Sequence, residues 1–146
     1  MLKSTSLLSR QLRRFLFLLC FSLLPAAALQ ASAAEINCNI QEHSCRQQVQ
    51  GRSVELDILP KPVKAMQELT FRVNVSGSPL SEPPFIDLDM PGMEMGPNQV
   101  SLKQVNATTY EGQGVIVRCP SGKRIWKATV VLPDTGQAEF VFDVVY

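Results

Sequence analysis

The feature that most constrains the fold is a series of short runs in which apolar residues alternate with polar ones. In the clearest run, Leu, Phe and Val at positions 69, 71, 73 and 75 alternate with Thr, Arg and Asn. A period of two is typical of a strand with one buried face, and no segment after residue 34 shows a sustained helical period. The pattern predicts strands at 54–58, 69–75, 85–90, 100–105, 110–118, 125–132 and 138–146.

Clusters of Pro, Gly, Asn, Asp and Ser separate these runs and predict tight turns between them. The connections are too short for the crossover helices that parallel sheets require, so α/β folds are excluded. About seven short strands predict an all-β domain, an immunoglobulin-like β-sandwich, with a small closed barrel as the alternative. We expect Gly112 and Gly114 to break the strand at 110–118, and Trp126 to lie in the core.

Residues 1–34 have the three parts of a secretory signal peptide. A basic start is followed by an apolar run at 15–24, and Ser32 and Ala34 suit a signal peptidase that cleaves before Glu35. Cleavage after Ala33 is the near alternative. The apolar run is shorter than the ~20 residues of a membrane span, but an uncleaved anchor remains an alternative. The sequence therefore predicts a periplasmic or secreted protein.

Removal of this segment changes the charge, because it holds four of the 14 basic residues and none of the 13 acidic ones. The mature chain has a net charge of −3 and no basic patch that would bind nucleic acid or an anionic membrane. Its length suits a single domain. We expect a polar, cysteine-containing segment at 35–52 and a β-sandwich domain at 53–146.

Three cysteines remain after cleavage: Cys38, Cys45 and Cys119. An oxidising compartment predicts one disulfide and one leftover thiol. All three pairings are open on sequence alone, and we favour Cys38–Cys45 because local closure is easiest. A zinc site of the three cysteines and His43 is disfavoured, since structural zinc ligands usually come as closely spaced pairs.

Catalytic patterns are mostly excluded. The single histidine, His43, lies in the polar N-terminal segment, and the chain has no nucleophile elbow, phosphate loop or dinucleotide fingerprint. Asp87 and Asp89 are spaced by two on a predicted strand, which puts both on its solvent face. We therefore expect a protein that is not an enzyme.

The segment richest in functional signal is the loop after the strand at 85–90. Met90, Met93 and Met95 fall within six positions, among prolines and glycines that could make their sulfur atoms converge. Thioether sulfur is a soft, neutral donor that selects Cu(I) over harder divalent ions. The loop predicts a Cu(I) site, with Met66, Cys119 and His43 as candidate additional ligands. Two alternatives stay open: a plug that packs one end of the sandwich, and a Met-rich surface that docks a protein partner.

The run 87–146 resembles the YtkA-like and FixH-like group of small exported domains. The shared motifs are a Met-Pro-x-Met-x-Met loop, a Tyr-x-Gly-x-Gly strand at 110–114 and a strand that carries Trp126. The resemblance implies an immunoglobulin-like sandwich in the setting of periplasmic copper handling and cytochrome oxidase assembly, and a partner protein from that setting. FixH-like members are membrane-anchored, which is consistent with the anchor alternative.

Overall fold

The computed structural model describes residues 34–146, so the predicted signal peptide lies, but for its last residue, outside the described residues. The described part contains strands and turns without a helix. It accordingly has no helix long and apolar enough to cross a membrane. The strands are β1 (Cys45–Val49), β2 (Arg52–Leu59), β3 (Glu68–Val75), β4 (Phe85–Asp89), β5 (Gln99–Ser101), β6 (Lys103–Gln104), β7 (Thr109–Val115), β8 (Ile125–Leu132) and β9 (Gly136–Asp143).

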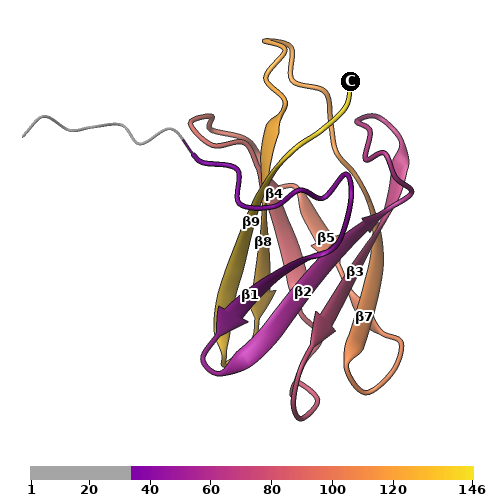
Figure 1. The fold of residues 1–146 in the computed structure, drawn as a ribbon, viewed down its shortest axis with the longest axis vertical. Helices are drawn as coiled ribbons and strands as arrows, with labels where there is room; N and C mark the ends of the chain where they lie inside the picture. The colour runs from indigo at the N-terminus through magenta and orange to yellow at the C-terminus, as the bar shows by residue number, and fades with distance from the viewer. Residues whose placement is uncertain (1–33) are drawn as a thin grey trace, which may run out of the picture. The chain divides into compact units, whose positions relative to one another are not determined.

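These strands form two antiparallel sheets that face each other (Figure 1). One sheet has the order β1-β2-β3-β7-β6, and the other has the order β5-β4-β8-β9. Within them, β2-β3-β7-β6 and β4-β8-β9 reproduce the two strand orders of an immunoglobulin domain. The predicted β-sandwich is confirmed, with nine strands in place of about seven.

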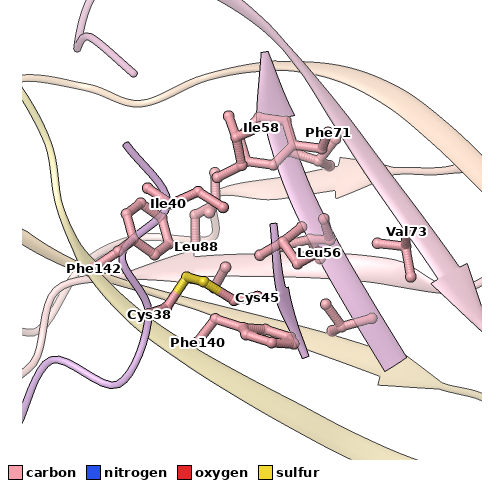
Figure 2. Close-up of a cluster of buried hydrophobic side chains, with 14 of the residues drawn as sticks. Cys38, Ile40, Cys45, Leu56, Ile58, Phe71, Val73, Leu88, Phe140 and Phe142 are labelled. Carbon is pink, nitrogen blue, oxygen red and sulfur yellow. A yellow bond between two sulfur atoms is a disulfide. The ribbon is translucent and has the colours of Figure 1, made fainter. Parts of the chain in front are cut away.

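The alternating runs decide which side chains fill the core. In the β2–β3 pair, Leu56 lies opposite Val73 and Ile58 opposite Phe71, and all four are fully buried. Their polar neighbours in sequence point to the other face of the sheet. Side chains from both sheets meet in one buried cluster that also contains the disulfide (Figure 2). Trp126 is buried there, as the sequence predicted.

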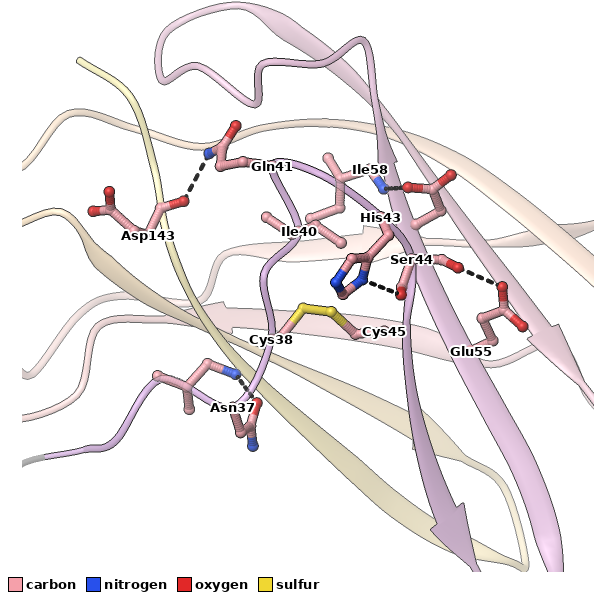
Figure 3. The surroundings of a disulfide bond; sticks show 12 residues. Asn37, Cys38, Ile40, Gln41, His43, Ser44, Cys45, Glu55, Ile58 and Asp143 are labelled. Carbon is pink, nitrogen blue, oxygen red and sulfur yellow. Dashed lines mark hydrogen bonds between the residues drawn. A yellow bond between two sulfur atoms is a disulfide. The ribbon is translucent and has the colours of Figure 1, made fainter.

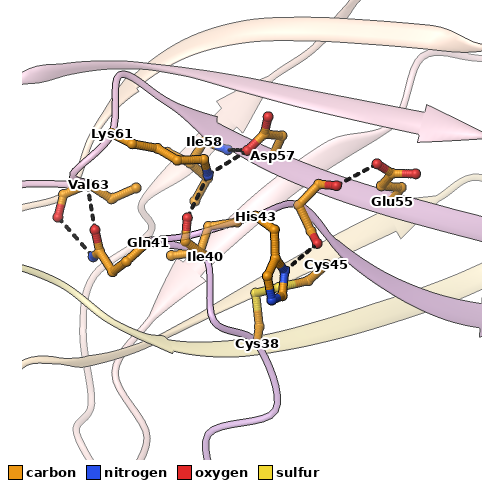
Figure 4. A network of polar contacts seen from close by, with 11 residues as sticks. Cys38, Ile40, Gln41, His43, Cys45, Glu55, Asp57, Ile58, Lys61 and Val63 are labelled. Atoms are coloured by element: carbon orange, nitrogen blue, oxygen red, sulfur yellow. Dashed lines mark hydrogen bonds and ion pairs between the residues drawn. A yellow bond between two sulfur atoms is a disulfide. The ribbon is translucent and has the colours of Figure 1, made fainter.

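The predicted Cys38–Cys45 disulfide is confirmed, and both half-cystines are buried (Figure 3). It links the start of β1 to the preceding segment, whose Ile40 also enters the core. Further ties come from polar contacts: the Gln41 side chain bonds both the N–H and the C=O of Val63 (Figure 4), and its amide also donates to the Asp143 carbonyl oxygen (Figure 3). The segment at 35–52 is thus built into the sandwich and is not an appendage to it.

The strand at 109–115 runs through Gly112 and Gly114 without a break, so the expected interruption is wrong. The two glycines instead allow the chain at Val100 and Ser101 to approach this strand closely. A Cβ at Gly112 would lie 2.3 Å from the Ser101 carbonyl oxygen, and one at Gly114 would lie 2.5 Å from a methyl of Val100. They therefore make room for the chain of β5 and β6 to cross from one sheet to the other against β7.

Several connections gather at one end of the sandwich, which we call the loop end (Figure 1). It comprises the β2–β3, β4–β5 and β7–β8 connections together with residues 144–146. The last strand stops at Asp143, short of the predicted Tyr146. Beyond it, Val145 makes a bridge with Lys64, and the N–H of Val144 donates to the Arg124 carbonyl oxygen. The methionine loop belongs to this end.

Candidate functional site

The methionine loop begins with a tight turn directly after β4. The N–H of Met93 donates to the carbonyl oxygen of Met90 over 3.0 Å, and Gly92 has φ +75°. Proline at the second position and a glycine with positive φ at the third are typical of a type II turn. At the base of the loop, the Leu88 N–H donates to the Asn98 carbonyl oxygen over 2.8 Å. The loop therefore leaves and re-enters the sheet at nearly one point.

A second proline-containing turn lies in the β7–β8 connection. The N–H of Gly122 donates to the carbonyl oxygen of Cys119 over 3.0 Å, and Gly122 has φ +75°. Cys119 opens this turn as its first residue, and Pro120 presets the backbone at the second position. The thiol is only 4% exposed, and it is the free cysteine of the described residues.

The two turns bring two sulfur atoms into contact. The Cys119 Sγ lies 3.5 Å from the Met93 Sδ, although the residues are 26 positions apart. A thiol is a weak donor and a thioether a weak acceptor, so the pair makes at most a weak hydrogen bond. Both atoms are soft donors to a metal, and one of them becomes anionic when deprotonated.

Ser121 affects the pKa of the Cys119 thiol. Its Oγ lies 3.0 Å from the Cys119 Sγ. This hydrogen bond lowers the pKa of Cys119 below its ordinary value, while desolvation acts in the opposite direction. Hydrogen bonds from the backbone at Ser121 and Lys123, and the charge of Lys123, lower the pKa further. The surroundings therefore favour the thiolate, which is the metal-binding form.

An open pocket of about 690 Å³ lies along the methionine loop and the outer face of β4. The three methionines of the loop line it; Met93 and Met95 are partly buried against the core, and Met90 is buried. Asp89 lines its wall and is held by Lys127, whose Nζ lies 3.3 Å from the carboxylate. Asp87 and Glu94 line the same pocket, so Lys127 offsets only part of its negative charge, and the thioethers are the soft donors that the pocket offers to a cation.

Met90 differs from the other two methionines because it is only 2% exposed. It continues the inward face of β4. The β4–β8 register, in which Asp89 faces Lys127, extends to place Met90 opposite the buried Trp126. Met90 thus packs in the core, whereas the packing alternative expects this of all three methionines, and Met93 and Met95 are only partly buried.

The remaining candidates are Met66 and His43. Met66 lies at the loop end, where its N–H donates to Ile116, but its side chain is 67% exposed. His43 lies beside the disulfide, with its Nδ1 2.9 Å from the Ser44 carbonyl oxygen (Figure 3). Among the described residues, no hydrogen bond joins either side chain to Met93 or Cys119.

Two neighbours of the sulfur pair were not anticipated from the sequence. Ser121 could have been found, because Cys-Pro-Ser-Gly is a turn signal that places a hydroxyl two residues from a thiol. Tyr146 contacts the same connection through its hydroxyl, which accepts a hydrogen bond from the Cys119 N–H over 3.2 Å. Nothing in the sequence pairs these two residues, because their contact depends on the tertiary fold.

Residues 34–146 contain no group of three or more His, Cys, Asp or Glu that could hold a metal. That set of donors does not include methionine sulfur, on which the candidate site is built. Comparisons with known protein families, with curated proteins and with solved structures each returned no match. The functional argument therefore depends on the geometry and chemistry of the sulfur pair.

Proposed function

We propose that this protein is an exported Cu(I)-binding protein without enzymatic activity, in which Met93 and Cys119 are the central ligands. The observation that most directly supports this proposal is the distance of 3.5 Å between the two sulfur atoms. Metal–sulfur bonds are about 2.3 Å long, so two sulfurs on one ion lie at most about 4.6 Å apart. The observed separation falls within that limit, and one ion could bond both atoms after a small adjustment.

The identity of the donors supports Cu(I) over other metals. Thiolate and thioether ligands select soft ions, while imidazole and carboxylate suit harder divalent ones. One thiolate also neutralises the single charge of Cu(I) in a place where Cys119 is almost fully buried. Met95 is the candidate third ligand, because it lines the same pocket as Met93 and is partly exposed.

Two independent features support export. The N-terminal sequence predicts export, and the buried Cys38–Cys45 disulfide is typical of proteins from oxidising compartments. A periplasmic copper carrier that serves cytochrome oxidase assembly is the specific role that the family resemblance suggests. Its partner would then be a copper-handling or oxidase-assembly protein.

A metal-free interaction module is the second candidate function. It is favoured by exposed apolar side chains at the loop end: Met66 is hydrogen-bonded through its backbone to Ile116, and Val115 and Val117 flank Ile116. Such a patch suits a protein partner. In that case the contact between Met93 and Cys119 is packing, and copper affinity does not depend on either sulfur.

The test is competition for Cu(I) against a chromophoric chelator, with the Met93→Leu/Met95→Leu double variant beside the wild-type protein. Leucine conserves volume but removes the donor atom, so the fold should persist while Cu(I) affinity falls. Met66→Leu is the matched control, because it makes the same change at an exposed methionine of the same end. Zn(II) should compete poorly. Equal Cu(I) affinity of wild type and double variant would leave the interaction module as the better proposal.

A further inference from the structure

The hydroxyl of Tyr146 joins the two ends of the turn that carries Cys119. It accepts a hydrogen bond from the Cys119 N–H over 3.2 Å and donates one to the carbonyl oxygen of Lys123. A phenol can do both at once, because its oxygen is donor and acceptor. The Arg118 guanidinium lies over the Tyr146 ring, 5.4 Å from its centroid, which is cation–π geometry. One side chain therefore contacts the β7–β8 connection at three residues.

The backbone next to Tyr146 is itself firmly held. The N–H of Val145 donates to the Val63 carbonyl oxygen over 3.0 Å, and the Val145 carbonyl accepts from Ala65 over 2.9 Å. On the other side, the Val144 carbonyl accepts from the Arg124 Nε over 3.1 Å. Tyr146 thus extends from a fixed segment toward a connection that has no strand partner of its own.

We propose that Tyr146 is a positioning residue for the copper site. It holds the Cys119 backbone in the place where the thiol contacts the Met93 sulfur. The inference deepens the proposed function and depends on it for its copper readout. Among the described residues, no hydrogen bond joins Tyr146 to either sulfur. It acts through the N–H of Cys119 and the carbonyl of Lys123, so its loss should let the turn move and the two sulfurs separate.

Tyr146→Phe removes only the hydroxyl and keeps the ring under Arg118. One or two net hydrogen bonds correspond to a loss of Cu(I) affinity of about 5- to 30-fold. The same variant should speed alkylation of Cys119 by iodoacetamide in the copper-free protein, because a looser turn exposes the nearly buried thiol.

Tyr110→Phe is the matched control. The Tyr110 hydroxyl also accepts one backbone hydrogen bond, from the Leu80 N–H over 3.2 Å, in the β3–β4 connection at the opposite end of the sandwich. This variant should lower the melting temperature while leaving both Cu(I) affinity and the Cys119 alkylation rate at wild-type values. A general loss of stability would change Cu(I) affinity and the Cys119 alkylation rate in both variants. Only a positioning role of Tyr146 predicts that both quantities change in Tyr146→Phe and that neither changes in Tyr110→Phe.

The two readouts also separate failure of this inference from failure of the proposed function. If wild-type protein does not bind Cu(I), the proposed function fails, and the alkylation rate still tests whether Tyr146 positions the thiol. If wild type binds Cu(I) and Tyr146→Phe changes neither readout, the positioning role is overturned. Should Tyr146→Phe not fold, amide hydrogen exchange in the wild-type protein replaces it. The Cys119 N–H should be protected from exchange by its bond to the Tyr146 hydroxyl, and exchange as fast as that of an exposed amide would overturn the role.

Discussion

The sulfur atoms of Met93 and Cys119 lie 3.5 Å apart, and neither residue belongs to a strand. Each sits in a turn that contains proline and a glycine with positive φ, one after β4 and one after β7. The sandwich supplies the ends of two strands from opposite sheets, and the turns bend the chain so that the two side chains meet. The pair therefore depends on both the sheet packing and the turn chemistry.

Cys119→Ser should lower Cu(I) affinity by more than about 100-fold, because loss of an outer-shell partner alone typically costs 10- to 100-fold and this variant removes a ligand. Serine is close to cysteine in size but more polar, and its hydroxyl can hydrogen-bond the Ser121 Oγ in place of the thiol, so the fold should persist. Chelator competition and thermal unfolding are the measurements. Wild-type affinity in Cys119→Ser would show that any copper bound is held elsewhere in the protein.

Substitution by leucine should have different effects on copper binding at Met90 and at Met93. Met90→Leu should keep Cu(I) affinity and cost less than about 1.5 kcal/mol, whereas Met90→Ala should cost about 2–5 kcal/mol because it leaves a cavity. Met93→Leu should lose affinity with little change in stability. Denaturant unfolding and chelator competition on the three variants would check this. Loss of copper binding in Met90→Leu would place Met90 among the ligands and contradict its assignment to the core.

Gly112→Ala should destabilise the domain by about 1–3 kcal/mol, because the added Cβ would meet the Ser101 backbone oxygen at 2.3 Å. Gly96→Ala is the control: it lies in the methionine loop, and a Cβ there has no heavy atom within 4 Å. This second variant should be neutral or slightly stabilising, since alanine restricts the unfolded chain. The comparison uses chemical unfolding of both. Equal stability of the two variants would argue against a close crossing of β5 and β7.

Much of the sandwich was predictable, because its central strands bury one face and so alternate in sequence. The predicted runs at 54–58, 69–75 and 125–132 match β2, β3 and β8 within two residues at each end. β1 was missed because only its two ends are buried, and the Arg-Gln-Gln between them gives no alternation. An edge strand held by main-chain pairing and a nearby disulfide needs no periodic pattern.

The candidate site was predictable only in part. The spacing of the methionines identified the loop, but it could not separate Met90, which enters the core, from Met93 and Met95, which do not. That separation depends on the Pro91–Gly92 turn, which reverses the chain after Met90. The contact between Met93 and Cys119 is set by the packing of two sheets, so no local pattern encodes it.

The pH dependence of stability should carry a contribution from Glu55. Its carboxylate accepts hydrogen bonds from Arg46 over 2.7 Å and from the Ser44 hydroxyl over 2.6 Å. The bond from Arg46 is the larger cause, and together they lower the pKa of Glu55 below its ordinary value. The unfolded chain then binds more protons than the folded one between the two pKa values, so stability rises with pH in that window.

The contribution of Glu55 should therefore be fully present above the ordinary glutamate pKa of about 4.3 and disappear as the pH falls through the lowered folded value. Glu55→Gln should be less stable than wild type by about 0.5–1 kcal/mol at pH 7, a small cost because Arg46 is largely exposed. The two unfolding curves should converge once the pH falls below the lowered pKa of Glu55. Arg46→Gln should reproduce most of the loss, and the double variant should add little, because both changes remove one interaction. A stability difference between wild type and Glu55→Gln that stays constant from pH 7 to pH 2 would show that the carboxylate contributes by packing and not by charge.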